Sequence, residues 1–401
     1  MSARELRRVV YVCTDPGIPV FGRKGASVHV QAILRVLRRR GVEVHLACTR
    51  TGGEAPADLS DVVVHALPGV PGGEPRAREL AAQASDAAVA DVLAQIAADG
   101  EIDLVYERYA LWGRTATAWA LRHGVRSLVE VNAPLIDEQR THRVLVDEAA
   151  ATAVGHSVMA TADGVSCVSE GVAAWVRGLV PHARVAVVPN GVDTRRITPA
   201  AGPVVGAHQP MTVGFVGTLK PWHGVEHLLD AVALLRADEQ DVRCLVVGDG
   251  PQATGLDALA ESLGIASAVE RTGAVAPEEI PALLRRMDVA TAPYPGEGTE
   301  YFSPLKVYEY LAAGLPVIAS TVGSIPALLE HGRWGELVAP GDPRALASAI
   351  ANLRSAVGHR QQIRDEAPGH ARRHDWDHVL ATSLEVIDAR LPEGALADVA
   401  R

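Results

Sequence analysis

The sequence predicts an α/β protein made of two Rossmann-like domains, each a parallel sheet wrapped by helices. The main observation is that short β-rich runs alternate with amphipathic helical patterns along most of the 401 residues, as in repeated βαβ units. A segment rich in Pro and Gly interrupts this alternation at residues 198–210, after which it starts again. Apolar residues make up 48% of the chain and aromatic residues only 4%, which suits helices packed on buried parallel strands.

The first half contains the longer series of predicted elements. The predicted strands are Val9–Cys13, Glu43–Cys48, Asp61–His65, Leu104–Tyr106, Ser127–Val131, Val165–Val168 and Val185–Val188. The clearest predicted helices between them are Val28–Arg39, Ala77–Ala98 and Thr141–Ala162. This half is predicted to form a domain over residues 1–200.

The second half repeats the pattern over residues 201–374. Its predicted strands are Thr212–Val216, Arg243–Val247, Val269–Thr272, Val289–Ala292 and Val317–Ala319. Because prolines and glycines continue neither helix nor strand, residues 198–210 are interpreted as a linker between the domains. The last helical pattern, Trp376–Arg390, has no predicted strand after it, so residues 375–401 are expected to be a helix and a frayed tail.

Composition excludes several classes of function. The formal net charge is −10 and the sequence pI is about 5.8, whereas nucleic-acid binding requires a basic surface. No apolar run reaches the roughly 18 residues of a membrane span, and the first residues lead directly into a strand, so no signal peptide is expected. The cysteines lie in strand-like runs without the spacing of a metal site, which is typical of buried thiols in a cytoplasmic protein.

Residues 301–320 are the most informative segment. Pro304 stands at the start of an apolar helix, Gly314 stands just past its end, and an apolar strand follows. Such a helix N-terminus presents backbone N–H groups and a positive dipole end to an anion. Glu309 follows about a turn and a half later, where a carboxylate can accept hydrogen bonds from sugar hydroxyls. A diphosphate followed by a ribose would satisfy both features.

This segment resembles the donor-binding helix of retaining glycosyltransferases of the GT-B class, family 4. The chain is similar to that family over roughly residues 8–390, most strongly from 163 to 341. The family usually has two glutamates separated by seven residues. Here Glu309 matches the second, the first falls on Tyr301, and Glu300 is one residue out of register. The Ser303-Pro-Leu-Lys306 version of the motif indicates a subgroup. The resemblance implies two doubly wound Rossmann-like domains facing a cleft, with the C-terminal helix returning to the N-terminal domain.

The resemblance also implies a set of donor-binding residues. In the family, the loop at Gly214–Gly224 supplies an Arg and a Lys to the donor diphosphate, and Thr218 and His223 occupy those positions here. Lys220 lies between them and is expected to stabilise the leaving group, with Lys306 as a possible second cation. His223 either helps when protonated or caps the loop. Lys220 and Glu309 are therefore the predicted catalytic residues. The other predicted donor-binding residues are Gly25, Gly217, Thr218, His223, Gly248, Gly250, Thr272, Gly273, Ser303, Pro304, Leu305 and Lys306.

Further candidates follow strands of the first half. The loop before the first long helix carries Gly25, which suits close approach of a phosphate or another backbone, although its spacing is not the G-x-G-x-x-G of dinucleotide binding. Arg108, Glu130 and Asn132 follow predicted strand ends, where ligands of open α/β sheets bind, and are expected on the acceptor side. The alternative is that Glu107 and Arg108 form a structural ion pair. The His that many relatives have near Asn132 is absent.

The motif Val187-Val-Pro-Asn-Gly-Val-Asp193 resembles a segment near the family's hinge. Because Asn-Gly favours a left-handed turn, Asn190 and Asp193 are expected to be structural.

The function implied is transfer of a sugar from a nucleotide-diphosphate sugar, with retention and without a covalent intermediate. The sugar nucleotide is a co-substrate, and the resemblance implies neither another cofactor nor a metal ion. The acceptor is a small molecule, a glycan or a lipid. Two alternatives remain, a nucleotide-sugar epimerase of the same architecture and a non-catalytic nucleotide-sugar sensor. A weak peripheral membrane contact is a further expectation, through the basic cluster formed by Arg35, Arg38, Arg39 and Arg40.

Overall fold

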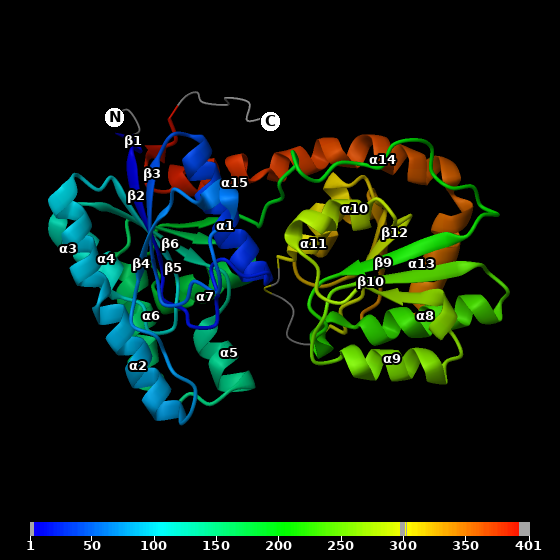
Figure 1. Cartoon of the computed structure of the whole chain (residues 1–401), viewed down its shortest axis with the longest axis horizontal. Coiled ribbons are helices and arrows are strands. Elements are labelled where there is room, and N and C mark those ends of the chain that lie inside the picture. The colour runs from blue at the N-terminus through cyan, green and yellow to red at the C-terminus, as the bar shows by residue number, and fades with distance from the viewer. Residues whose placement is uncertain (1–3, 297–300, 302, 393–401) are drawn as a thin grey trace. The chain divides into compact units, whose positions relative to one another are not determined.

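The computed structural model describes residues 4–296, 301 and 303–392. The chain divides into two compact units, Met1–Pro189 with Trp376–Arg401, and Asn190–Asp375. Each unit is a parallel sheet with helices on its faces (Figure 1). The predicted fold class of two Rossmann-like domains is confirmed.

The first unit contains a sheet with the strand order β4-β3-β2-β5-β6-β7-β8. The strands of this unit are β1 (Arg4–Glu5), β2 (Arg8–Cys13), β3 (Glu43–Cys48), β4 (Val63–Ala66), β5 (Leu104–Arg108), β6 (Arg126–Val131), β7 (Gly164–Cys167), β8 (Val185–Val187) and β15 (Ala389–Arg390). Its helices are α1 (Gly25–Arg39), α2 (Pro75–Ala87), α3 (Val89–Asp99), α4 (Thr115–His123), α5 (Leu135–His142), α6 (Glu148–Thr161), α7 (Glu170–Leu179) and α15 (Trp376–Glu385).

The second unit contains a sheet with the strand order β11-β10-β9-β12-β13-β14. Its strands are β9 (Met211–Val216), β10 (Val242–Val247), β11 (Val269–Arg271), β12 (Val289–Ala292), β13 (Val317–Ser320) and β14 (Gly335–Val338). Its helices are α8 (Val225–Ala237), α9 (Ala253–Ser262), α10 (Ile280–Leu284), α11 (Leu305–Ala312), α12 (Ile325–Leu328), α13 (Pro343–Ser355) and α14 (Val357–Ala371).

The core of the second unit lies on both faces of its sheet because alternate residues of each strand point to opposite sides. On β9, Val213 and Phe215 join the apolar cluster of α8, α9 and α13, whereas Val216 joins the cluster of α11 and α14. Strands buried on both faces explain the continuous apolar runs that predicted a parallel sheet. Figure 1 shows α8 and α9 on one side of β9 and β10 and α11 on the other.

Several predicted boundaries differ from the structure. The predicted helix Ala77–Ala98 is two helices that meet at Ala88. The predicted helix Thr141–Ala162 begins at Glu148, because the Asp147 side chain accepts a hydrogen bond from Ala150 N and caps it there. Strand β14 was not predicted. Strand β15 follows the last helix, where no strand is predicted from sequence, and it pairs with β1.

The interpretation of residues 198–210 as a linker is wrong. Arg360 donates hydrogen bonds to the carbonyls of Val205 and Leu353, and Arg364 donates to Gly202 O. This Pro/Gly-rich segment is therefore fixed along α14, inside the second unit. Its composition indicated the absence of regular structure, not the absence of packing.

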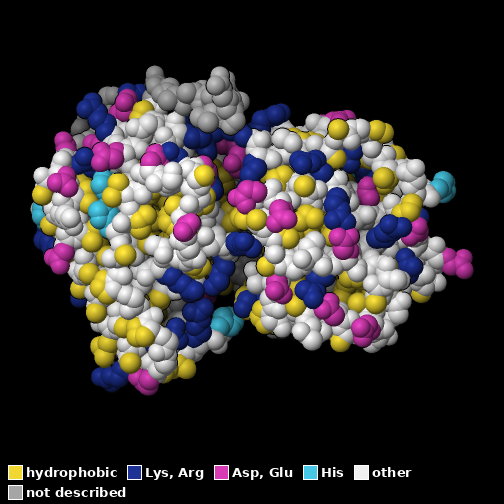
Figure 2. All heavy atoms as spheres, in the orientation of Figure 1, with side chains coloured by type: hydrophobic (Ala, Val, Ile, Leu, Met, Phe, Trp, Pro, Cys, Tyr) yellow, Lys and Arg dark blue, Asp and Glu magenta, His cyan; other side chains and the backbone are white. Residues whose placement is uncertain are grey.

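Other expectations concern the cysteines and the surface. All four cysteines are buried and unpaired, as predicted. Acidic and basic side chains are interspersed on the visible face of the second unit (Figure 2). Among the described residues, no helix is both long and apolar enough to cross a membrane.

Replacing Arg360 tests whether this buried guanidinium holds the 198–210 segment. Arg360→Met keeps the apolar stem but leaves the carbonyls of Val205 and Leu353 without their charged donor, which is expected to cost roughly 1–3 kcal/mol of unfolding free energy. Limited proteolysis should then cut within residues 198–210 faster than in the wild type. The control is Arg344→Met, an exposed arginine on α13. Equal stability and equal cleavage of the two variants would contradict this role.

Candidate functional site

The sheet of the second unit has a topological switch point. The chain passes from β9 outward through β10 to β11, and later returns to place β12 on the other side of β9. Ligands of such sheets bind beyond the carboxyl ends of the strands where the order reverses. The segments that follow β9 and β12 at this point are residues 217–220 and 293–296. They define the candidate site.

Helix α11 reaches this edge of the sheet. The Tyr310 hydroxyl accepts a hydrogen bond of 2.8 Å from Val216 N, at the last residue of β9. Pro304 immediately precedes α11 in an extended conformation. The helix N-terminus that follows it, with its first backbone N–H groups, is the end of a helix that favours an anion. Tyr301, which occupies the position of the family's first glutamate, is among the described residues. The neighbouring Glu300 lies outside them.

Lys306 is the most unusual side chain at this edge. It is only 8% exposed, and its Nζ makes no hydrogen bond in the described part of the chain. The ammonium lies 4.1 Å from the ring centroid of Phe215 and 5.4 Å from that of Tyr294. A Cβ built on Gly217 would lie 3.0 Å from Nζ, so the amine is directly against the loop that follows β9. Burial lowers the pKa of Lys306 to about 7, although Glu309 opposes the shift.

Glu309 lies less than one turn further along the same helix and is partly buried. Burial raises its pKa to about 7, while Arg196 and Lys306 act in the opposite direction. Arg196 is not among the site residues predicted from the sequence. Its place is set by Asp193, whose Oδ1 accepts from the backbone N–H groups of Arg195 and Arg196. Asp193 therefore stabilises a local turn, which is the structural role expected for it. The influence of Arg196 on Glu309 has no signature in the sequence.

The charge of the loop after β9, at Lys220, lies beside an aromatic ring. The Nζ atom of Lys220 lies 5.5 Å from the ring centroid of Trp222, an exposed residue, and Thr218 is also exposed. Burial lowers the pKa of His223 to about 3, with Lys306 adding to the effect, so its imidazole is neutral at pH 7. Its Nδ1–H donates to Thr218 O. Of the two roles considered for His223, the geometry supports capping of the loop.

The predicted glycines hold the neighbouring strand ends close together. A Cβ on Gly248 would lie 2.0 Å from Gly217 O, and one on Gly250 would lie 2.4 Å from Leu219 O. Gly248 also forms an isolated bridge with Gly273. The first reason for glycine at 248 and 250 is therefore backbone packing. The Thr272 hydroxyl donates to Gly273 O, so its proton is already used in a hydrogen bond within the protein.

In the first unit, Glu130 is the centre of a buried polar cluster. It receives hydrogen bonds from Tyr106 OH at 2.8 Å and Arg108 at 2.5 Å, a further one from Asn132, and lies 2.8 Å from His29 Nε2. These charged and polar partners hold the pKa of Glu130 at about 2 despite burial. The structure thus brings the three predicted acceptor-side residues together, but Glu130 organises the others instead of presenting its carboxylate to a ligand.

The loop before α1 is tied to that helix. Gln31 Nε2 donates to Val20 O and Gly22 O, and Ser27 Oγ donates to Pro19 O. Gly25 is the first residue of α1 and is exposed. The loop is therefore preformed, through two side chains that the sequence argument did not single out.

The basic cluster on α1 is paired with acids within the first unit. Arg35 pairs with Asp58, and Arg38 pairs with Asp61. Arg39 and Arg40 both pair with Asp377 on α15. Because three carboxylates compensate most of the charge of these four arginines, the cluster's attraction for an anionic membrane surface is reduced.

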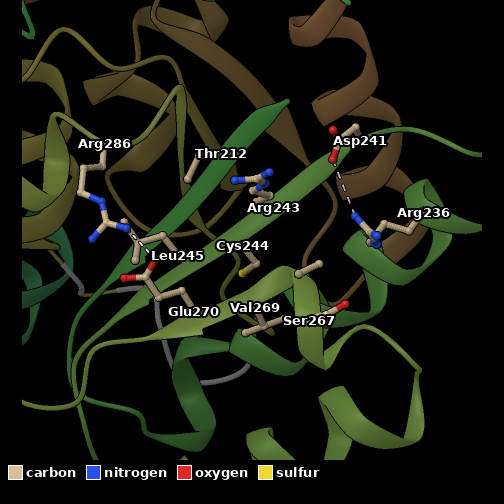
Figure 3. A pocket seen from close by; sticks show the side chains of 11 residues that line it. Thr212, Arg236, Asp241, Arg243, Cys244, Leu245, Ser267, Val269, Glu270 and Arg286 are labelled. Carbon is tan, nitrogen blue, oxygen red and sulfur yellow. Dashed lines mark hydrogen bonds and ion pairs between the residues drawn. The ribbon is translucent and has the colours of Figure 1, made fainter. Parts of the chain in front are cut away.

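One groove of about 350 Å³ lies elsewhere in the second unit (Figure 3). It is at the amino ends of β9, β10 and β11, the edge of the sheet away from the loops that follow these strands. Arg286 pairs with Glu270 at its rim, and Arg236 lies 3.8 Å from Asp241. The groove is therefore separate from the candidate site. Among the described residues, no group of His, Cys, Asp and Glu is arranged to hold a metal ion.

The alternative interpretation from the sequence was a structural ion pair between Glu107 and Arg108. It is wrong, because Arg108 pairs with Glu130. Glu107 is fully buried, and neither carboxyl oxygen makes a hydrogen bond of standard geometry in the described part of the chain. Burial raises its pKa from 4.5 to about 8, and Asp86 adds to the shift. At pH 7 the folded protein therefore keeps this carboxyl protonated.

Glu107→Gln should remove a pH dependence of stability. Between pH 4.5 and about 8 the folded state holds a proton that the unfolded state releases, so wild-type stability falls as pH rises. The variant should match the wild type near pH 4.5 and exceed it by roughly 1–4 kcal/mol at pH 8. Urea unfolding across this range measures the difference. The exposed Glu54→Gln is the control, and parallel curves for all three proteins would contradict the assignment.

Comparisons with known proteins show which family the chain resembles. Residues 23–196 match the model described as "Glycosyltransferase Family 4", and residues 210–355 match "Glycosyl transferases group 1". A protein of Actinosynnema mirum named D-inositol 3-phosphate glycosyltransferase is 31% identical over 395 residues, covering 90% of this chain and 91% of the relative. A protein of the same name from Salinispora tropica is 28% identical, covering 92% and 82%.

Solved structures share the fold. The sucrose-phosphate synthase of Thermosynechococcus elongatus has a TM-score of 0.72 with 19% identity, covering 94% of this chain and 97% of that structure. The HepE protein of Anabaena, solved in complex with UDP, has a TM-score of 0.70 with 18% identity, covering 95% and 99%.

Proposed function

The chain belongs to the family 4 and group 1 glycosyltransferases of the GT-B fold, and we propose that it transfers a sugar from a nucleotide-diphosphate sugar with retention of configuration. The observation that carries this proposal is the buried ammonium of Lys306, which has no hydrogen-bond partner among the described residues and lies beside the N-terminus of α11. A buried cation without a partner is costly, and a diphosphate would supply the missing acceptor.

In this proposal the donor diphosphate binds between Lys306, the N-terminus of α11 and the loop at residues 217–220. Glu309 holds the ribose. The sequence alone puts the main cation at Lys220, whereas the geometry favours Lys306, because Lys220 lies over the exposed Trp222 ring. The Ser303-Pro-Leu-Lys306 motif would then define a subgroup in which a lysine on the helix replaces the basic residues of the loop.

The proposed chemistry uses no side-chain nucleophile. The acceptor hydroxyl attacks the anomeric carbon on the face from which the diphosphate leaves, so one C–O bond forms while another breaks. The acceptor proton passes to the departing phosphate oxygen. Charge grows on that oxygen as the bond breaks, and Lys306 and the helix N-terminus stabilise it. The acceptor side is proposed at the carboxyl edge of the first sheet, where Arg108 and Asn132 are held by Glu130.

A donor and acceptor panel tests the function. UDP-sugars come first because the structurally similar HepE was solved with UDP, and GDP-, ADP- and dTDP-sugars follow. D-inositol 3-phosphate belongs in the acceptor panel because the curated relatives carry its name. Transfer with retention, or slow donor hydrolysis, supports the proposal. Inversion of the anomeric configuration or epimerisation of the donor would contradict it, and tight binding without turnover would indicate a sensor.

Two lysine variants distinguish the alternative cations. Lys306→Ala should lower kcat by about 10²–10³, as expected for loss of one preorganised group at a developing oxyanion. Lys220→Ala should change kcat by less than about threefold, since this partly exposed charge lies beside the exposed Trp222 ring and is screened by solvent. Single-turnover kinetics with the preferred donor measures both. The reverse ranking would assign the diphosphate to Lys220, as the sequence alone suggests.

The pH dependence of donor use should be bell-shaped with a maximum near pH 7. Glu309 must lose its proton to accept from the ribose, and Lys306 must keep its proton to attract the diphosphate, and both have pKa values of about 7 in the empty site. Because the two groups interact, the apparent values belong to the pair. Lys306→Arg should abolish the alkaline limb of kcat/KM for the donor, and Glu309→Gln should abolish the acid limb and lower kcat/KM about 10- to 150-fold.

The charge state of Lys306 can also be measured directly. The chain has three lysines, Lys24, Lys220 and Lys306, so the ¹³Cε signals of labelled lysine should be resolved and assigned with the variants. A titration midpoint near 10.5 for Lys306 would contradict the lowered pKa.

A further inference from the structure

Asn190 is bonded to the turn that precedes the donor helix. Its backbone N donates to Ser303 Oγ at 3.1 Å, and its side-chain Nδ2 donates to Ser303 O at 2.5 Å. Both residues are 8% exposed. The Ser303 hydroxyl also lies 3.2 Å from the Tyr308 hydroxyl. Both polar groups of Ser303 are therefore used within the protein, although the sequence argument placed this residue in contact with the donor.

The conformation of the backbone does not explain why residue 190 is asparagine. The Asn-Gly pair predicted a left-handed turn, but Asn190 is not among the residues with positive φ in the described part of the chain. Its carboxamide has a different use, because an amide N–H can donate to the Ser303 carbonyl and a carboxylate or an aliphatic side chain cannot.

The segment that carries Asn190 is itself fixed. Val192 N donates to His374 O at 2.9 Å, and the Thr194 hydroxyl donates to Asp375 at 2.6 Å. On the other side, the ring of Tyr308 on α11 lies 5.1 Å from that of His374. The turn at Ser303 is thus held between an anchored asparagine and the first turns of α11.

We propose that Asn190 is a positioning residue for the nucleotide donor. It fixes the Ser303–Pro304 turn, and through that turn it sets the direction of the first N–H groups of α11 and the place of Lys306 against the loop after β9. It acts on the diphosphate through Ser303 and makes no contact with the donor. This inference rests on the proposed function, since it names the residue that holds the proposed diphosphate site in shape.

The test compares Asn190→Ala and Asn190→Asp with the wild type and with Asn352→Ala. Asn352 is an exposed asparagine on α13 whose side chain donates to Glu336, so its replacement removes a hydrogen bond away from the site. Calorimetry with UDP, GDP, ADP and dTDP first identifies the nucleotide that the wild type binds. For that nucleotide, the Kd and the donor KM should rise about tenfold in Asn190→Ala and at least as much in Asn190→Asp. The KM of the acceptor should stay unchanged.

A purely structural role predicts a different result. In that case the thermal stability and the active fraction of the variants would fall, while folded protein would bind the nucleotide with the wild-type Kd, and the inference would be overturned. An equal rise in Kd for Asn352→Ala would overturn it as well. If the wild type binds none of the four nucleotides and uses none of their sugars, the proposed function fails together with the inference. Binding by the wild type with unaltered Kd in both Asn190 variants rejects the inference alone.

Discussion

The buried ammonium of Lys306 is the interaction on which the rest of the candidate site depends. Taking a cation out of water costs several kcal/mol unless other groups compensate for the lost hydration. Here the compensation within the protein is partial, because the faces of Phe215 and Tyr294 attract the charge but accept no conventional hydrogen bond. The lowered pKa of Lys306 expresses this deficit. In the proposed function, the donor diphosphate removes this deficit, so part of the donor affinity would be stored as a cost in the empty state.

The surrounding backbone is arranged so that this charge has a fixed place. The loops after β9 and β10 approach so closely that Gly248 and Gly250 have no room for a Cβ, and Tyr310 ties the end of β9 to α11. Loops without side chains at their contact points can be packed rigidly at the carboxyl edge of the sheet. Preorganisation of this kind matters for catalysis, because groups that are already in position need no reorganisation when charge develops on the leaving oxygen.

The sequence predicted those parts of the molecule that follow from local pattern. Buried strands, the helix that starts after Pro304 and the two-domain α/β class are confirmed because apolar periodicity and capping residues decide them locally. The errors arose where long-range contacts decide. Residues 198–210 look like a linker until Arg360 and Arg364 of α14 are seen to hold them. The donors that surround the Glu130 carboxylate, with His29 beside it, likewise have no signature in the sequence. Arg196 could not be found at all, since its relation to Glu309 exists only after folding.

The same long-range logic explains why the loop after β9 lacks the two basic residues expected from the family resemblance. Thr218 is uncharged, and His223 is neutral because burial and the nearby Lys306 both lower its pKa. A lysine at position 223 would put a second ammonium into the same buried space, where repulsion between like charges is weakly screened. A cation on the helix and uncharged side chains at positions 218 and 223 are therefore mutually consistent, whereas a second cation at position 223 would be costly. In the proposed function, the charge on α11 is the electrostatic partner of the diphosphate. The turn at Ser303, which is hydrogen-bonded to Asn190, would then position that partner.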